Sequence, residues 1–161
     1  MTKDTLHFLF EYRDGKLFWK NKSHPRSNIK IGSEAGGNAH HGYKNIQIEN
    51  KRLYLHRVIF FYHHGYFPET VDHIDNNPEN NRIENLRAAT LSENAQNCST
   101  RTHNKLGIKN VFFDKKVNKY RVYVRAKNNQ IYVGTYDDLD LASLVASEAR
   151  NKYHGTFANH K

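Results

Sequence analysis

Cysteine is almost absent from this chain of 161 residues, which contains Cys98 alone. One thiol cannot form an intramolecular disulfide, and it cannot supply the cysteine pair of a zinc site. A long apolar run is also missing, which argues against a membrane as partner. The opening residues, MTKDTLHFLFEYRDG, lack the layout of a secretory signal. We therefore expect a globular cytoplasmic protein with a reduced thiol.

Positive charge is in clear excess, with a formal net charge of +9 and an isoelectric point near 9.6. Residues 1–95 hold 13 basic and 11 acidic side chains, whereas residues 96–161 hold 12 and 5. This distribution predicts an anionic partner for the last third of the chain. Nucleic acid ranks ahead of lipid because no basic amphipathic helix is visible. Charge that serves only solubility is the alternative.

The most informative stretch runs from Leu55 to Asn97 and reads LHRVIFFYHHGYFPETVDHIDNNPENNRIENLRAATLSENAQN. At its centre a carboxylate, Asp72, stands beside an imidazole, His73, and Asn94 offers a further carboxamide. Oxygen and nitrogen donors of this kind suit a hard divalent metal. The alternative is a polar turn, because Asn, Asp and Pro are dense between Asp72 and Asn85.

Hydrophobic periodicity around this stretch predicts short helices and strands. Helical spacing is expected over residues 5–12 and 56–64, the second ending at Gly65, and strands over 16–20, 43–49 and 52–55. Two further strand candidates cover residues 70–74 and 83–89. Thr90 to Glu93 has the spacing of a capping box, which places Asn94 on a first helical turn. Two antiparallel strands and a helix would let Asn94 face back toward Asp72 and His73.

A second pattern begins after residues 98–104, which are polar and predict a linker. Strands are expected over 111–113, 120–126 and 130–136, and an amphipathic helix over 139–153 with Leu141, Leu144, Val145 and Ala149 as its apolar side chains. Side chains alternate along a strand, so five polar or aromatic residues share the face opposite the core: Arg121, Tyr123, Arg125, Gln130 and Tyr132.

The chain resembles the HNH endonucleases of phages and introns, in the variant with asparagine at the third signature position. The segments that carry the resemblance are LHR, VDHIDNNPENNRIENLRAAT and SENAQN. The resemblance implies a ββα-metal, treble-clef-like nuclease module over residues 1–97. It makes His73 the general base for the attacking water, and Asp72 and Asn94 the ligands of one divalent ion, Mg²⁺ or Mn²⁺. Asn85 corresponds to the asparagine that braces the histidine loop.

The last third of the chain resembles the DNA-binding domain of plant ethylene-response factors. The segments that carry the resemblance are KNVFFDKKVNKYRVYVR, YVGTYDDLDLASLVASEA and HGTFAN. That resemblance implies a three-stranded antiparallel sheet packed on one helix over residues 105–161, with the outward Arg121, Tyr123, Arg125, Gln130 and Tyr132 toward DNA. The plant domain is richer in Arg and Trp on its first strands. A small stabilising subdomain with solvated lysines is the alternative.

Together these patterns predict an α+β protein with a nuclease module and a DNA-anchoring module. We expect a metal-dependent homing endonuclease that hydrolyses phosphodiester bonds in double-stranded DNA, acting in a phage-infected bacterial cell, with neither a membrane nor a small-molecule cofactor as partner. Two rivals remain open. One is a DNA-binding protein with an inactive nuclease remnant, and the other is a structure-specific or RNA-directed nuclease.

Overall fold

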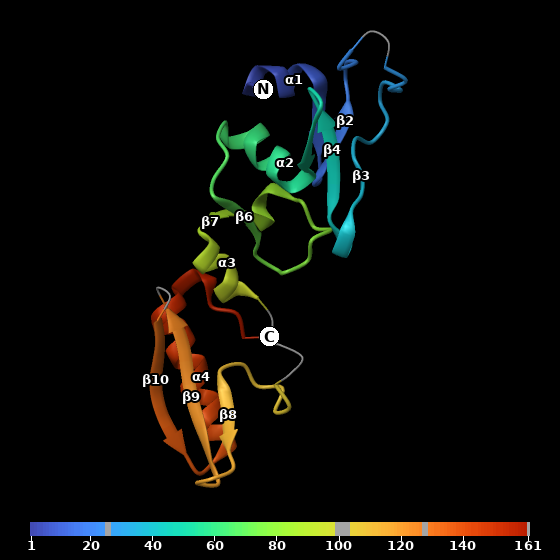
Figure 1. Cartoon of the computed structure of the whole chain (residues 1–161). Helices are drawn as coiled ribbons and strands as arrows, with labels where there is room; N and C mark the ends of the chain where they lie inside the picture. Colours follow the sequence, from blue (N-terminus) through green and yellow to red (C-terminus); the bar gives the residue numbers. More distant parts are fainter. Residues whose placement is uncertain (25–26, 99–103, 127–128, 161) are drawn as a thin grey trace. The chain divides into compact units, whose positions relative to one another are not determined.

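The computed structural model describes residues 1–24, 27–98, 104–126 and 129–160. The chain divides into two compact units, Met1–Thr90 and Leu91–Lys161 (Figure 1). Most of the expected linker, residues 99–103, lies outside the described residues, so a nuclease domain over 1–97 and a DNA-binding domain over 105–161 stay predictions. No helix in the described ranges is long and apolar enough to cross a membrane.

The first unit consists of short elements joined in three small antiparallel sheets, β1–β2, β3–β4–β5 and β6–β7. The elements in chain order are α1 (Lys3–Leu9), β1 (Phe10–Arg13), β2 (Lys16–Trp19), β3 (Gly37–Asn38), η1 (His40–Gly42), β4 (Lys44–Ile48), β5 (Lys51–Tyr54), α2 (Leu55–His64), β6 (Thr70–His73), η2 (Ile83–Asn85) and β7 (Leu86–Ala89).

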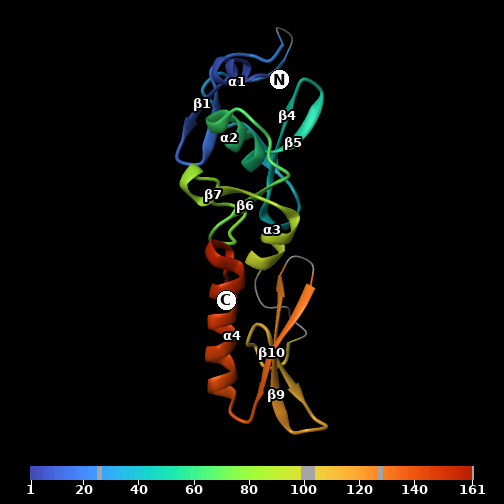
Figure 2. The same ribbon diagram turned by 90° about the vertical axis from the view of Figure 1, so that its left-hand side faces the viewer.

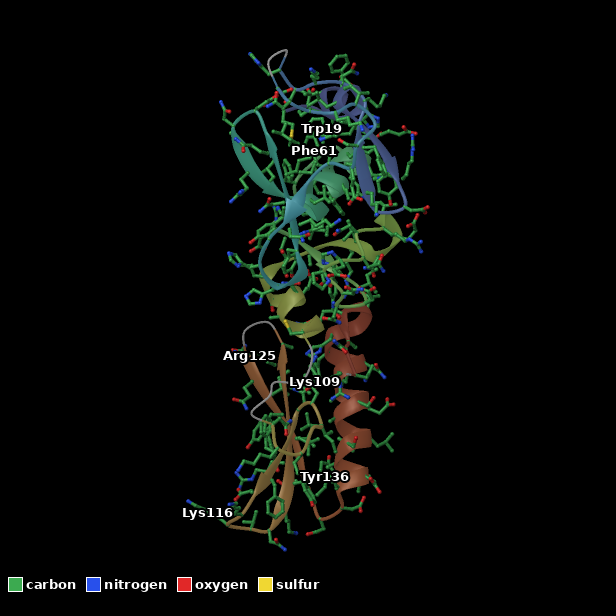
Figure 3. The ribbon with its side chains drawn as sticks, turned by 90° about the vertical axis from the view of Figure 1, so that its right-hand side faces the viewer. Trp19, Phe61, Lys109, Lys116, Arg125 and Tyr136 are labelled. Carbon is green, nitrogen blue, oxygen red and sulfur yellow. The ribbon has the colours of Figure 1, made fainter. Side chains whose placement is uncertain are left out.

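Helix α2 forms the centre of the first unit and contacts α1, β4, β5, β6 and β7 (Figure 1). Val58 and Ile59 are completely buried, and Phe61 joins the same core as Trp19 of β2 (Figure 3). The helix ends at Gly65, whose φ of 80° is the left-handed conformation that glycine adopts at helix ends. The small sheets therefore share one hydrophobic core, which fixes the strand that carries the motif.

The expected helix over residues 5–12 is wrong in its second half. Helix α1 ends at Leu9, and residues from Phe10 onward form strand β1, which pairs with β2 around the Asp14–Gly15 turn. Phe10 pairs with Trp19, and their rings lie 4.4 Å apart. This cross-strand pair outweighs the local helical spacing. The strand expected over 83–89 likewise begins as the single turn η2 before β7.

The second unit contains α3 (Leu91–Asn97), β8 (Val111–Asp114), β9 (Lys119–Ala126), β10 (Asn129–Tyr136), α4 (Leu139–His154) and η3 (Gly155–Phe157). Its strands form one antiparallel sheet in the order β10–β9–β8, and α4 packs along one face of it (Figure 2). Tyr136 packs against the core on that face (Figure 3). Three strands and one helix were expected here. The coarse fold class, mixed α+β with several small antiparallel sheets, is confirmed.

The apolar face of α4 differs from the expected one. Leu141 and Leu144 are 47% and 59% exposed, whereas Ala142 and Ala146 are completely buried against the sheet and Ala149 is 5% exposed. Alanine at these spacings lets the helix backbone approach the strands closely, and the larger leucines then point outward. The prediction that Leu141 and Leu144 form the packed face is therefore wrong.

Candidate functional site

Strands β6 and β7 place a buried ion pair at the centre of the motif. Asp72 lies opposite Arg87 in the register, and Asp72 is only 5% exposed. Nε and Nη2 of Arg87 both donate to Oδ2 of Asp72, at 2.8 and 2.7 Å. The pair is a charge-assisted contact in which both guanidinium nitrogens share one carboxylate oxygen.

His73 follows on the same strand and is also 5% exposed. Its Nε2 lies 3.0 Å from Oδ1 of Asn81, a residue of the following loop that is 4% exposed. Two rings cover the imidazole: His56 at 5.0 Å and Tyr43 at 6.0 Å between ring centroids. The imidazole is therefore held from several elements at once, in one orientation.

His56 opens the first turn of α2 beneath His73. The pKa of His56 is lowered from 6.5 to about 3, chiefly by burial and to a smaller extent by the nearby His73 and Arg57. His56 is consequently a neutral packing partner at neutral pH. The structure gives it no charge with which to bind a phosphate.

Asn85 ties the two ends of the loop after β6 together. Its carboxamide oxygen accepts the Asp75 backbone N–H at 3.1 Å, and its Nδ2 donates to Oδ1 of Asp75 at 2.9 Å and to the Asn80 carbonyl at 2.8 Å. Burial raises the pKa of Asp75, but hydrogen bonds from Asn80, the Asn77 backbone and Asn85 outweigh this effect and leave it lowered. These bonds fix the loop directly after His73.

The β1–β2 hairpin braces the same loop from the other side. Tyr12 accepts the Ile83 backbone N–H through its hydroxyl at 2.9 Å. Gly15 sits so close that a Cβ there would lie 2.8 Å from the Arg82 nitrogen and 2.9 Å from the Asn81 carbonyl carbon. A side chain at this position would collide with that backbone. The φ of +81° is a second reason for glycine here, because other residues rarely adopt it. Elements more than fifty residues upstream thus position the loop.

Asn94 is half-buried on α3, in the second unit. The C-terminal end of α3 is held within that unit, since Nζ of Lys109 donates to the Gln96 carbonyl at 2.8 Å and Nδ2 of Asn159 donates to the Asn97 carbonyl at 2.5 Å. The structure therefore brings Asp72, His73 and Asn85 together in the first unit. The pairing of Asp72 with Asn94 still rests on the sequence resemblance.

No group of three or more His, Cys, Asp or Glu side chains that could hold a metal gathers within the described ranges. The expected ligand set is of a different kind, one carboxylate and one carboxamide. Asp72 fits such a role, because an ionised carboxylate offers about four lone-pair sites and can bind both Arg87 and a cation. Oxygen donors of this kind suit Mg²⁺ better than zinc.

The outer face of the second unit's sheet carries the five residues expected there. Arg125 lies opposite Gln130, and Tyr123 lies opposite Tyr132 with ring centroids 5.4 Å apart. Arg125, Gln130 and Tyr132 are exposed. Arg121 is half-buried and pairs with Asp114 at 2.6 Å, so its charge is partly compensated. This face therefore combines aromatic rings with guanidinium groups.

Phe112 of β8 is 50% exposed and extends this row of rings, with its centroid 6.2 Å from that of Tyr123. Sequence reasoning missed two contacts in the motif of the first unit. These are the hydrogen bond between Asn81 and His73 and the ion pair between Arg87 and Asp72. The alternation of β6 and β7 could have indicated Arg87 opposite Asp72, but nothing in the sequence distinguishes Asn81 from its neighbour Asn80.

Comparison with known proteins defines the class of this chain. Residues 53–96 match the family model described as HNH endonuclease, from β5 to α3. Protein 3.8 of Escherichia phage T7 is 34% identical over 94 residues, which cover 58% of this chain and 74% of the phage protein. The chain belongs to the family of that phage protein and carries an HNH endonuclease domain. No solved structure matches it significantly.

Proposed function

We propose that this protein is a metal-dependent DNA endonuclease of the homing type, which hydrolyses phosphodiester bonds in duplex DNA. The observation that carries the proposal is the β6–β7 hairpin, where a buried Asp72 and a buried His73 stand side by side within the HNH domain. The +9 net charge supplies the attraction for a polyanion.

His73 acts in this proposal as the general base. Histidine is the side chain whose ordinary pKa lies closest to neutral, so it can accept a proton from the attacking water at physiological pH. Asn85 and the β1–β2 hairpin hold the loop that follows it. The described contacts therefore serve orientation of the imidazole, which general-base catalysis requires.

Asp72 and Asn94 would hold one divalent ion, Mg²⁺ or Mn²⁺, in a ββα-metal arrangement. Such an ion stabilises negative charge on the phosphate and on the departing 3′ oxygen. Asp72 contributes a carboxylate held in place by Arg87, and Asn94 contributes a carboxamide on the first turns of α3. A set of two protein ligands leaves room for substrate oxygens and water.

The second unit would anchor the protein on duplex DNA through the face that carries Arg121, Tyr123, Arg125, Gln130 and Tyr132. Guanidinium groups bind phosphates and base edges, and exposed rings contact sugars and bases. The acidic Asp114 beside Arg121 leaves Arg125 as the stronger phosphate contact of the two. The plant domains that this unit resembles use the corresponding face.

One cleavage assay tests the proposal and its rivals together. Purified protein is incubated with duplex DNA, single-stranded RNA and branched DNA, each with Mg²⁺ or with EDTA. We expect cutting of duplex DNA that requires Mg²⁺. Cutting of RNA alone or of branched DNA alone would show that the substrate is that nucleic acid and not duplex DNA. Binding of duplex DNA without any cutting would identify an inactive nuclease remnant.

A further inference from the structure

Asn81 stands out among the asparagines of the loop after β6. Asn76 and Asn77 are exposed and Asn80 is half-buried, whereas Asn81 is only 4% exposed. Asn77 accepts a backbone N–H at 3.1 Å, and Asn80 donates to Asp75 at 2.7 Å, so both shape the loop. Asn81 instead directs its carboxamide oxygen at a ring nitrogen of His73, 3.0 Å away.

This contact sets where the proton of the neutral imidazole resides. A carboxamide oxygen is an acceptor only, so Nε2 of His73 must be the donor. The neutral ring has one N–H and one lone pair, and the lone pair is then on Nδ1. Both residues are buried, and the other tautomer would direct the Nε2 lone pair at the Asn81 oxygen, so that tautomer is disfavoured.

We propose that Asn81 is the positioning residue of the nuclease site, which selects the Nε2–H tautomer of His73 and so presents Nδ1 as the proton acceptor. The inference deepens the proposed function, on which its catalytic meaning rests. Asn81 touches neither water nor phosphate in this role and acts only through His73.

The backbone around Asn81 supports such a role. Its N–H donates to the Glu79 carbonyl at 3.1 Å, and Gly15 of the β1–β2 turn packs directly on the Asn81–Arg82 peptide. The rings of His56 and Tyr43 lie 5.0 and 6.0 Å from the imidazole of His73, measured between centroids. Donor and acceptor are thus held by separate elements, strand β6 for His73 and the loop against Gly15 for Asn81.

The direct test is long-range ¹H–¹⁵N NMR of the full chain without metal or DNA, above the pH at which imidazoles are protonated. We expect wild-type His73 to be a single Nε2–H tautomer with its ring proton close to the Asn81 carboxamide. Asn81→Leu has a similar shape but accepts nothing, and should give a mixture of tautomers. Asn81→Asp keeps an oxygen acceptor and should restore the Nε2–H form.

Asn77→Ala is the matched control, because it removes one loop hydrogen bond without touching the imidazole, and it should leave the tautomer unchanged. An Nδ1–H tautomer in the wild-type protein would overturn the proposal even if Asn81→Leu failed to fold. Identical tautomer populations in wild type and folded Asn81→Leu would overturn it as well.

Kinetics provide the second readout and separate this inference from the proposed function. Asn81→Leu should lower kcat by about 10- to 100-fold with little change in KM, and Asn81→Asp should recover most of it. If His73 is needed for cleavage but its tautomer ignores Asn81, only this inference fails. If Asn81 controls the tautomer and His73→Ala still cuts, the base assignment fails instead.

Discussion

His56 shows how one buried side chain supports the site without taking part in its chemistry. It is 6% exposed and lies against both His73 and Tyr43. A histidine at the start of a helix, as in LHR, can cap the helix, pack in the core or bind a metal, and the sequence does not choose among these roles. Burial decides in favour of packing, and burial is a property of the assembled core that no local pattern contains.

The low pKa of His56 predicts how stability depends on pH. The unfolded chain takes up a proton near pH 6.5, whereas folded His56 does so only near pH 3. The contribution of His56 to the free energy of unfolding is therefore fully present above pH 6.5 and is lost as the pH falls toward 3. Lowering the pH from 7 to 5 should reduce the free energy of unfolding by about 2 kcal/mol through this group alone. Urea unfolding at both pH values measures the change.

His56→Phe is the comparison for this prediction, because it keeps a buried ring and removes the titrating group. Its unfolding free energy should lose less between pH 7 and pH 5 than that of the wild type. His63 and His154 also have lowered pKa values, so they contribute to the pH dependence in the same direction. An equally steep loss in the variant would show that His56 is not the group that titrates.

At the scale of elements, the β1–β2 hairpin acts on the motif through Gly15. Gly15→Ala would place a methyl group 2.8 Å from the Arg82 nitrogen. Gly32 has the same φ of +81° but nothing within 4 Å of its Cβ position. Gly32→Ala should therefore cost only the backbone strain, about 1–2 kcal/mol, and Gly15→Ala about 1–3 kcal/mol more.

Urea unfolding of both variants measures this difference, and the cleavage assay at a temperature where both are folded shows its effect on the site. We expect Gly15→Ala to lose activity, because the displaced backbone carries Asn81. Equal stability and equal activity of the two variants would mean that the hairpin does not brace the loop.

Elements with strong local patterns were predictable from sequence, and those decided by packing were not. The helix that ends at Gly65, the strand at Asp72 and His73 and the three strands of the second unit lie close to their expected bounds. The end of α1 depends on a cross-strand pair, and the packed face of α4 depends on how near the sheet lies. Both are tertiary effects that periodicity does not report.

The same limit applies to the candidate site. The roles of Asp72, His73, Asn85 and Asn94 were assigned from the resemblance to HNH endonucleases, and they stay predictions. Their supporting contacts were not readable. Asn81 and Asn80 are neighbours of identical type, and only the fold distinguishes the one that reaches the imidazole.

At the scale of the whole molecule, the uneven charge predicts where DNA affinity resides. Arg125→Ala should weaken duplex DNA binding and reduce the magnitude of the salt slope by about 1, as loss of one phosphate contact requires. Lys116→Ala removes the same charge at the turn between β8 and β9 and is the matched control (Figure 3). Titrations at several salt concentrations compare them.

Equal effects of the two substitutions would mean that the sheet face attracts DNA only through its general positive charge. A larger effect of Arg125→Ala supports an anchoring face on the second unit. Point substitutions suit this question better than a deletion from Lys105, because such a cut falls inside the compact unit Leu91–Lys161.

The central claim is that the buried imidazole of His73 is the general base for phosphodiester hydrolysis. Cleavage and binding of the same duplex DNA by wild type and His73→Ala, with Mg²⁺ present, test it most directly. We predict that His73→Ala loses cleavage by about 10²-fold or more, the usual contribution of a general base, while its DNA affinity stays unchanged. Nicking by His73→Ala at the wild-type rate would contradict the claim.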